Sequence, residues 1–117
     1  MIKNSLKLEE LAMFIGSIAF FLYLGNSIVL FLILLFLPDL GMIGYIINTK
    51  VGAVTYNVLH HKGIAVLFLL MGFYLNINIL IITGIIIFAH SSLDRFLGYG
   101  LKYRDSFQNT HLGKIGK

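Results

Sequence analysis

Long apolar stretches alternate with short polar breaks along most of the chain. Four of these stretches approach or exceed the roughly 20 helical residues that a membrane crossing needs. They cover about residues 8–24, 27–47, 51–74 and 79–98, and a more polar tail follows at residues 99–117. The breaks are short, so consecutive helices are expected to lie antiparallel. The pattern predicts an all-α membrane protein, a bundle of four transmembrane helices with a C-terminal tail.

The composition supports a membrane protein and excludes several kinds of chemistry. Of the 117 residues, 58% are hydrophobic and only 12% are charged, with a mean hydropathy of +0.90. Soluble domains carry about 25% charged residues. The length suits one polytopic domain over residues 1–117. Because the chain has no cysteine, disulfides, thiolate metal ligands and cysteine nucleophiles are excluded.

Basic residues gather on one side of the predicted bundle. Lysine and arginine precede the first segment, separate the second from the third, and recur in the tail, whereas the other two turns carry no charge. The residues concerned are Lys3, Lys7, Lys50, Lys102, Arg104, Lys114 and Lys117. Since cytoplasmic loops are enriched in such residues, both termini are expected in the cytoplasm. Membrane lipids are the expected partners, and no basic helix or patch points to nucleic acid.

Three of the four segments carry an ionisable side chain at a similar depth. With a rise of about 1.5 Å per residue, Asp39, His60 and His90 lie about 12–13 Å from the cytoplasmic ends of their segments. Asp94 lies one turn from His90, on the same helix face. Ionisable residues in membrane spans are costly and normally pair inside the bundle. The agreement in depth predicts one buried His/Asp site.

Imidazole and carboxylate groups together suit a divalent metal, with zinc first and iron or manganese as alternatives. The candidate metal ligands are Asp39, His60, His90 and Asp94, with His61 as the alternative to its neighbour. A catalytic metal site leaves a position for water and makes that water nucleophilic near neutral pH.

Further residues near this layer are candidates for catalysis and substrate binding. Asp39, His61 and Lys62 are the candidate catalytic residues, as a general base or as a charge that polarises the substrate. The candidate substrate-binding residues are Tyr56, Asn57 and Arg95. The first two lie four and three residues before His60, so they share its helix face.

Each of these groups also has a plainer interpretation. His90 and Asp94 can lock helices together as a hydrogen-bonded pair, and Asp39 can cap a helix that breaks at the preceding proline. Lys62 can extend toward the headgroups, and Arg95 can pair with a nearby acid. The tail can rest on headgroups or fold back over the site as a lid.

Four separated blocks of sequence resemble a known family. The stretches PDLGMIGY, VGAVTYNVLHH, AHSSLDRFLGYGLKY and THLGKIGK are similar to a bacterial family of small four-span membrane proteins, domain of unknown function 4260. The resemblance covers about residues 8–116. It implies a fold and a bacterial inner membrane location, and no activity.

A looser resemblance rests on three shorter blocks. LPD at residues 37–39, HHKG at 60–63 and HSSLD at 90–94 are similar to inner-membrane metal-dependent hydrolases induced in the bacterial damage response. This resemblance implies that the same His and Asp residues form the metal and catalytic set. The chain departs from that pattern at Leu40 and Gly41, where a second acid would stand.

Three functions are compatible with these features. The leading hypothesis is a metal-dependent hydrolase acting on a lipid or lipid-linked substrate. A second is a small transport or proton-relay module in which the His/Asp layer passes protons or holds an ion. A third is a structural protein that assembles, for example as a homo-oligomer, through glycine-rich helix faces.

Overall fold

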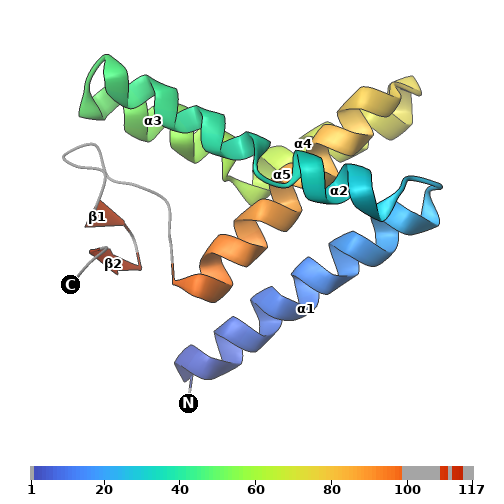
Figure 1. Ribbon diagram of the computed structural model, residues 1–117, viewed down its shortest axis with the longest axis horizontal. Coiled ribbons are helices and arrows are strands. Elements are labelled where there is room, and N and C mark those ends of the chain that lie inside the picture. Colours follow the sequence, from blue (N-terminus) through green and yellow to red (C-terminus); the bar gives the residue numbers. More distant parts are fainter. Residues whose placement is uncertain (1, 99–108, 111, 115–117) are drawn as a thin grey trace.

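The chain is helical over most of its length (Figure 1). The computed structural model describes residues 2–98, 109–110 and 112–114. Its helices are α1 (Ile2–Tyr23), α2 (Ile28–Leu34), the 3-10 helix η1 (Leu37–Ile46), α3 (Thr49–Leu59), α4 (Lys62–Leu75) and α5 (Asn78–Leu97). The strands β1 (Asn109–Thr110) and β2 (Gly113–Lys114) form a short antiparallel hairpin. The prediction of a helical protein is confirmed; apart from this hairpin, the predicted tail lies almost wholly outside the described residues.

The second predicted segment consists of two helices. The Ser27 hydroxyl accepts a hydrogen bond from the Leu30 N–H at 3.1 Å and so caps the start of α2. α2 ends shortly before Pro38, because a proline has no N–H and its ring disfavours helical geometry in the preceding residue. The chain continues as η1, with Pro38 in its first turn. The predicted kink is therefore a complete break between two kinds of helix.

The third predicted segment is also broken, at His60 and His61. The His60 N–H bonds to the Asn57 carbonyl at 3.2 Å, which closes the end of α3. The His61 side chain accepts a hydrogen bond from the Ile64 N–H at 3.2 Å and caps the start of α4. The axes of the two helices are bent by 49°. At this break, His60 ends α3 and the adjacent His61 caps the start of α4.

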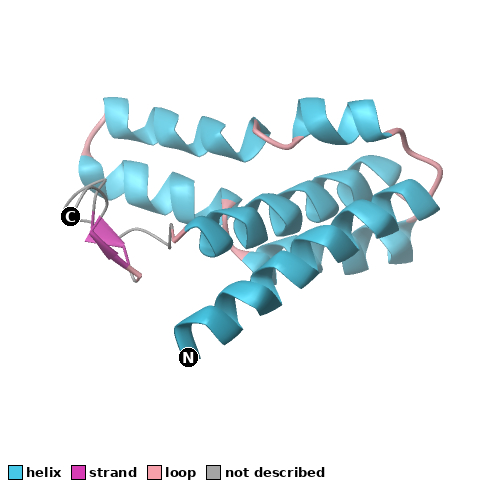
Figure 2. Cartoon of the chain, turned by 60° about the horizontal axis from the view of Figure 1, so that its bottom comes forward, coloured by secondary structure: helices cyan, strands magenta, loops and turns pink. Residues whose placement is uncertain are grey.

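α5 is the central helix, and it packs against both α1 and α4 (Figures 1 and 2). Its middle is buried over Gly84–Ile87 and Ala89–Ser92. Against it lie two aromatic rings, Phe21 and Phe31, which meet edge to face with centroids 5.4 Å apart. α3 packs mainly against η1. The residues around His90 therefore lie in the most enclosed part of the described chain.

Glycines allow the neighbouring helices to approach closely. A Cβ added at Gly84 would lie 2.7 Å from the Ala65 carbonyl oxygen on α4. A Cβ at Gly52 would lie 2.2 Å from the Tyr45 ring, between α3 and η1. Small residues at such positions are typical of helix contacts in membranes.

Two helical stretches of the described chain are long and apolar enough to cross a membrane. They are Ile28–Ile46, with a mean hydropathy of 2.3, and Asn78–Leu97, with 1.6. The bent pair of α3 and α4 adds a third if it forms one broken span. α1 does not join them, although residues 8–24 were predicted to span, and its first half is rich in charge.

Two glycines form a matched test of this packing. Gly84→Ala forces a Cβ against main-chain atoms of α4, and such overpacking costs about 1–3 kcal/mol. The detergent-solubilised variant should therefore melt below the wild type when followed by circular dichroism. Gly16 on α1 has nothing within 4 Å of an added Cβ, so Gly16→Ala should melt at or above the wild type. Equal melting temperatures for the two variants would contradict the close approach of α4 and α5.

Candidate metal centre

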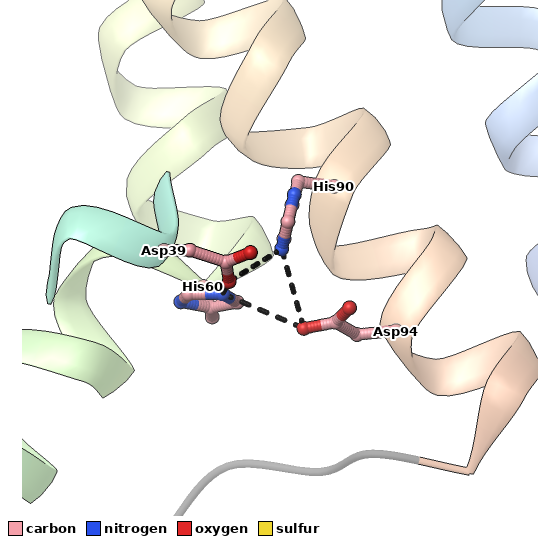
Figure 3. A group of neighbouring side chains, drawn as sticks. All are labelled: Asp39, His60, His90 and Asp94. Carbon is pink, nitrogen blue, oxygen red and sulfur yellow. Dashed lines mark hydrogen bonds and ion pairs between the residues drawn. The ribbon is translucent and has the colours of Figure 1, made fainter. Parts of the chain in front are cut away.

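Four side chains from different parts of the chain meet where η1, the α3–α4 break and α5 come together (Figure 3). Asp39 comes from η1, His60 from the break, and His90 and Asp94 from α5. One ligand atom from each residue lies within 4.8 Å of the other three. The structure thus brings together the four residues predicted as ligands, and it selects His60 from the adjacent histidine pair.

Each imidazole nitrogen lies beside two carboxylate oxygens. His60 Nε2 is 3.2 Å from Asp39 Oδ1 and 3.4 Å from Asp94 Oδ2. His90 Nε2 is 3.1 Å and 3.4 Å from the same two oxygens. In a tetrahedral zinc site with bonds of about 2.0–2.1 Å, neighbouring ligand atoms are roughly 3.3–3.4 Å apart. These four separations therefore suit a small divalent cation at the centre of the group.

Hydrogen bonds to main-chain oxygens orient both imidazoles. His60 Nδ1 lies 2.8 Å from the Tyr56 carbonyl oxygen, and His90 Nδ1 lies 2.5 Å from the Leu35 carbonyl oxygen. A carbonyl can only accept, so both Nδ1 atoms carry the hydrogen. In the neutral rings Nε2 is then unprotonated and presents its lone pair to the centre, as metal-binding histidines commonly do.

The helix breaks supply these two carbonyl acceptors. In a continuous α-helix the Leu35 oxygen would accept from the N–H of Asp39, and that of Tyr56 from the N–H of His60. Instead, these N–H groups bond one residue later, to Phe36 and Asn57. Each break therefore leaves a carbonyl open, and a histidine side chain fills the place.

The number of hydrogens that the group can place between its ligand atoms depends on the protonation of the two imidazoles. With neutral rings, two lone pairs and two carboxylate oxygens face one another, and His90 Nε2 has no hydrogen-bond partner among the described residues. One protonated ring would place a single hydrogen among these atoms, and protonating both His60 and His90 would set two cations side by side between the two carboxylates, since their ring centroids are 4.7 Å apart. Both rings are almost fully buried, where like charges repel strongly. A divalent cation held by three or all four of these atoms would offset the lone pairs that face one another here.

Tyr56 supports two of the four residues. Its ring stacks on that of His60, with centroids 3.8 Å apart and planes 10° from parallel. Its hydroxyl donates a hydrogen bond to Asp94 Oδ2 at 3.1 Å. Tyr56, predicted as a substrate-binding residue, therefore contacts two candidate metal ligands directly.

Ser91 and Arg95 fasten the break that carries His60. The Ser91 hydroxyl donates to the His60 carbonyl oxygen, and Arg95 Nη2 donates to the same oxygen at 3.3 Å. Arg95 Nη1 bonds to the Ser91 carbonyl at 3.1 Å. Sequence reasoning missed Ser91; its place one turn before Arg95, in the polar last third of α5, was the available signal.

The remaining predicted residues lie outside the group of four. His61 is exposed and caps α4 through Nδ1. The Lys62 ammonium pairs with the Glu10 carboxylate on α1 and lies 5.6 Å from the centroid of the Phe88 ring. Asn57 contributes its carbonyl to the end of α3. None of the three side chains is one of the four that meet at the centre.

The centre opens to its surroundings on the side of Asp39. That side chain is 39% exposed, against 1% for His60, 2% for His90 and 14% for Asp94. Water therefore has access beside the Asp39 carboxylate.

Comparison with known proteins agrees with the resemblance of the four sequence blocks. The family model described as Domain of unknown function (DUF4260) matches residues 3–115, nearly the whole chain. The chain belongs to the DUF4260 family. No curated protein and no solved structure matches it. Because the DUF4260 description names no activity, function has to be argued from the centre itself.

The adjacent histidines provide a matched test of the metal centre. His60→Ala and His90→Ala each remove a buried nitrogen ligand, so both should abolish binding of zinc, iron or manganese to the purified protein. His61→Ala removes only a helix cap and should keep the metal content of the wild type. Elemental analysis of the three variants beside the wild type makes the comparison. Equal metal content in all three would rule out the four-residue centre.

The Tyr56 hydroxyl should tune the affinity for metal. Tyr56→Phe keeps a ring to stack on His60 and removes the hydrogen bond to Asp94. Loss of such an outer partner typically weakens metal binding about 10–100-fold, which competition with a chromogenic chelator measures. Tyr74 is 87% exposed, so Tyr74→Phe is the control and should bind as the wild type. An unchanged affinity in Tyr56→Phe would mean that Asp94 needs no support from this hydroxyl.

Proposed function

We propose that this protein is a metal-dependent hydrolase of the bacterial inner membrane that acts on a lipid or lipid-linked substrate. The observation that carries the proposal is the convergence of four ligand atoms, from two histidines and two aspartates, all within 4.8 Å of one another. Zinc is the first candidate, because imidazole nitrogens and carboxylate oxygens are its usual ligands in catalytic sites. The resemblance of the LPD, HHKG and HSSLD blocks to metal-dependent hydrolases supports the same reaction class.

The four residues divide naturally into three ligands and one base. His60, His90 and Asp94 are oriented by further hydrogen bonds, from Tyr56 and to two main-chain carbonyls. Asp39 is the most exposed of the four and lies beside both Nε2 atoms. Three protein ligands with one open position are typical of catalytic zinc sites. We therefore assign the first three as ligands and Asp39 as the general base.

The chemistry requires one proton acceptor beside the reacting water. A divalent cation at this point would make water acidic enough to act near neutral pH and would polarise the bond under attack. Asp39 accepts a proton as the water oxygen attacks the ester carbon or phosphorus. The bond to the leaving alcohol then breaks, and Asp39 returns the proton to that alcohol. The products are an acid and an alcohol, and no further reactant is needed.

An apolar groove beside the centre supports a lipid as the substrate. The groove has a volume of about 480 Å³, within the usual range for ligand sites. One wall is the face of α5 that carries Ile79, Thr83 and Ile87, and the same face continues to His90 and Asp94. Pro38 and Leu59, the chain neighbours of Asp39 and His60, also line it. An acyl chain in this groove would have its polar end beside the centre.

The membrane setting is part of the proposal. We propose that α1, despite the charge in its first half, crosses the inner membrane together with the other three apolar segments, with both termini in the cytoplasm, which the distribution of lysine and arginine supports. In that orientation the α1 segment is held against α4 by the Lys62–Glu10 pair. A proton relay has less support, because the groove beyond the centre is lined by apolar side chains, with Thr83 as the exception.

Asp39 and Asp94 should behave differently when made neutral. Asp39→Asn removes the base and should lower the hydrolysis rate by about 10²–10⁴-fold, while bound zinc stays near the wild-type amount. Asp94→Asn removes a ligand and should lose both metal and activity. Elemental analysis, together with hydrolysis of chromogenic carboxyl and phosphate esters bearing alkyl chains, separates the two. Loss of metal from Asp39→Asn would make Asp39 a ligand instead of the base.

The length of the groove should set the preferred length of the substrate chain. Ile79 lies eleven residues before His90, about 16 Å along α5, and is 71% exposed. Ile79→Trp should shorten the groove and lower kcat/KM for long-chain esters about tenfold relative to short-chain esters, because two buried methylenes are worth roughly that factor. Ile33→Trp is the control: its side chain is 66% exposed and outside the groove. Equal chain-length profiles for the two variants would place the substrate elsewhere.

A further inference from the structure

A second cavity, apart from the apolar groove beside the metal centre, has a largely charged lining. It has a volume of about 440 Å³ and lies between the first turns of α1 and the end of α5. Its charged lining consists of Lys3, Lys7, Glu10 and Arg95. None of the four residues of the metal centre lines it. The cavity is therefore a separate feature, with three cations around one acid.

The acid in this lining is already paired. The Glu10 carboxylate bonds to the Lys62 ammonium, which is not part of the lining. Because that pair is neutral, Glu10 balances little of the positive charge of Lys3, Lys7 and Arg95. Among the described residues, the hydrogen bonds of Arg95 go to the Ser91 and His60 carbonyls, which are uncharged. In the described part of the chain, the lining thus combines three positive charges with a single acid, and that acid is already paired with Lys62.

The sequence arranges these cations on one surface. Lys3 and Lys7 are four residues apart and therefore lie on the same face of α1. Arg95 lies in the last turn of α5, and its guanidinium is held by the Ser91 carbonyl, one turn earlier, and by the His60 carbonyl at the α3–α4 break. A fixed guanidinium beside two mobile ammonium groups is a typical arrangement for binding phosphate. Leu6 and Leu112 add an apolar edge.

We propose that this cavity binds a phosphate group, with Arg95 as the fixed contact and Lys3 and Lys7 as the flexible ones. The proposal does not rest on the metal centre or on hydrolysis. Phosphate belongs either to the headgroup of an anionic lipid or to a soluble phosphate compound. The apolar edge and the place of the cavity near the ends of two helices favour the lipid headgroup.

Calorimetric titration of the full-length, detergent-purified protein tests the proposal. Treating the protein with a chelator first removes any contribution from the metal centre. The probes are inorganic phosphate, a short-chain phosphatidic acid, and the diacylglycerol with the same chains. We expect saturable binding of phosphatidic acid that weakens with salt, and no binding of the diacylglycerol. Inorganic phosphate that binds as tightly as phosphatidic acid would identify a soluble ligand, and weaker binding would identify the lipid.

Matched lysine variants show whether the binding belongs to this cavity. Lys3 and Lys7 are exposed, so the double variant Lys3→Gln/Lys7→Gln should fold normally. It should bind phosphatidic acid at least about tenfold more weakly, because the loss of even one charge-assisted hydrogen bond costs that much. Lys50 is also exposed but lies outside the cavity, so Lys50→Gln should bind within about twofold of the wild type. Unchanged binding in the double variant, or equal weakening in Lys50→Gln, would overturn the proposal.

Discussion

Two main-chain oxygens left open at helix ends determine how the candidate metal centre is built. The carbonyls of Leu35 and Tyr56 would be used up inside continuous α-helices, and each is instead bonded by a histidine Nδ1. The same breaks turn Asp39 and His60 toward α5. If the second segment were a straight helix, Asp39 would turn away and His90 would lose its bond to the Leu35 carbonyl. If the third were straight, His60 would turn away and lose its bond to the Tyr56 carbonyl. The breaks and the centre are one structural feature.

Much of the centre could be predicted from the sequence, because ionisable side chains in apolar segments are costly unless they pair, and these lie at one depth. That argument singled out Asp39, His60, His90 and Asp94. It left the choice between His60 and His61 open, since both lie at nearly the same depth. The choice depends on which main-chain N–H groups are satisfied at the break, and hydropathy carries no information about that. The contact of the Tyr56 hydroxyl with Asp94 joins two distant segments and was equally hidden.

The fold was predictable in outline for a related reason. The last segment, predicted at residues 79–98, is α5 at Asn78–Leu97, because a long apolar run with a glycine at its end leaves little choice. The second segment held a visible signal in Pro38, although the change to a 3-10 helix was not apparent. The break after α3 falls at His60 and His61, and neither a proline nor a glycine stands there to predict it. There the helix ends because side chains compete successfully for main-chain groups.

The broken ends have an electrostatic consequence for what the centre can hold. Peptide dipoles give the C-terminal end of a helix a partial negative charge. α2 and α3 both end beside the group of four, and the Leu35 and Tyr56 carbonyls face its imidazoles. This field would attract a cation. It would repel an anionic ligand, as the two carboxylates also do. An anionic ligand would therefore be tolerated at this point only in company with a metal ion, so the cation would have to bind first.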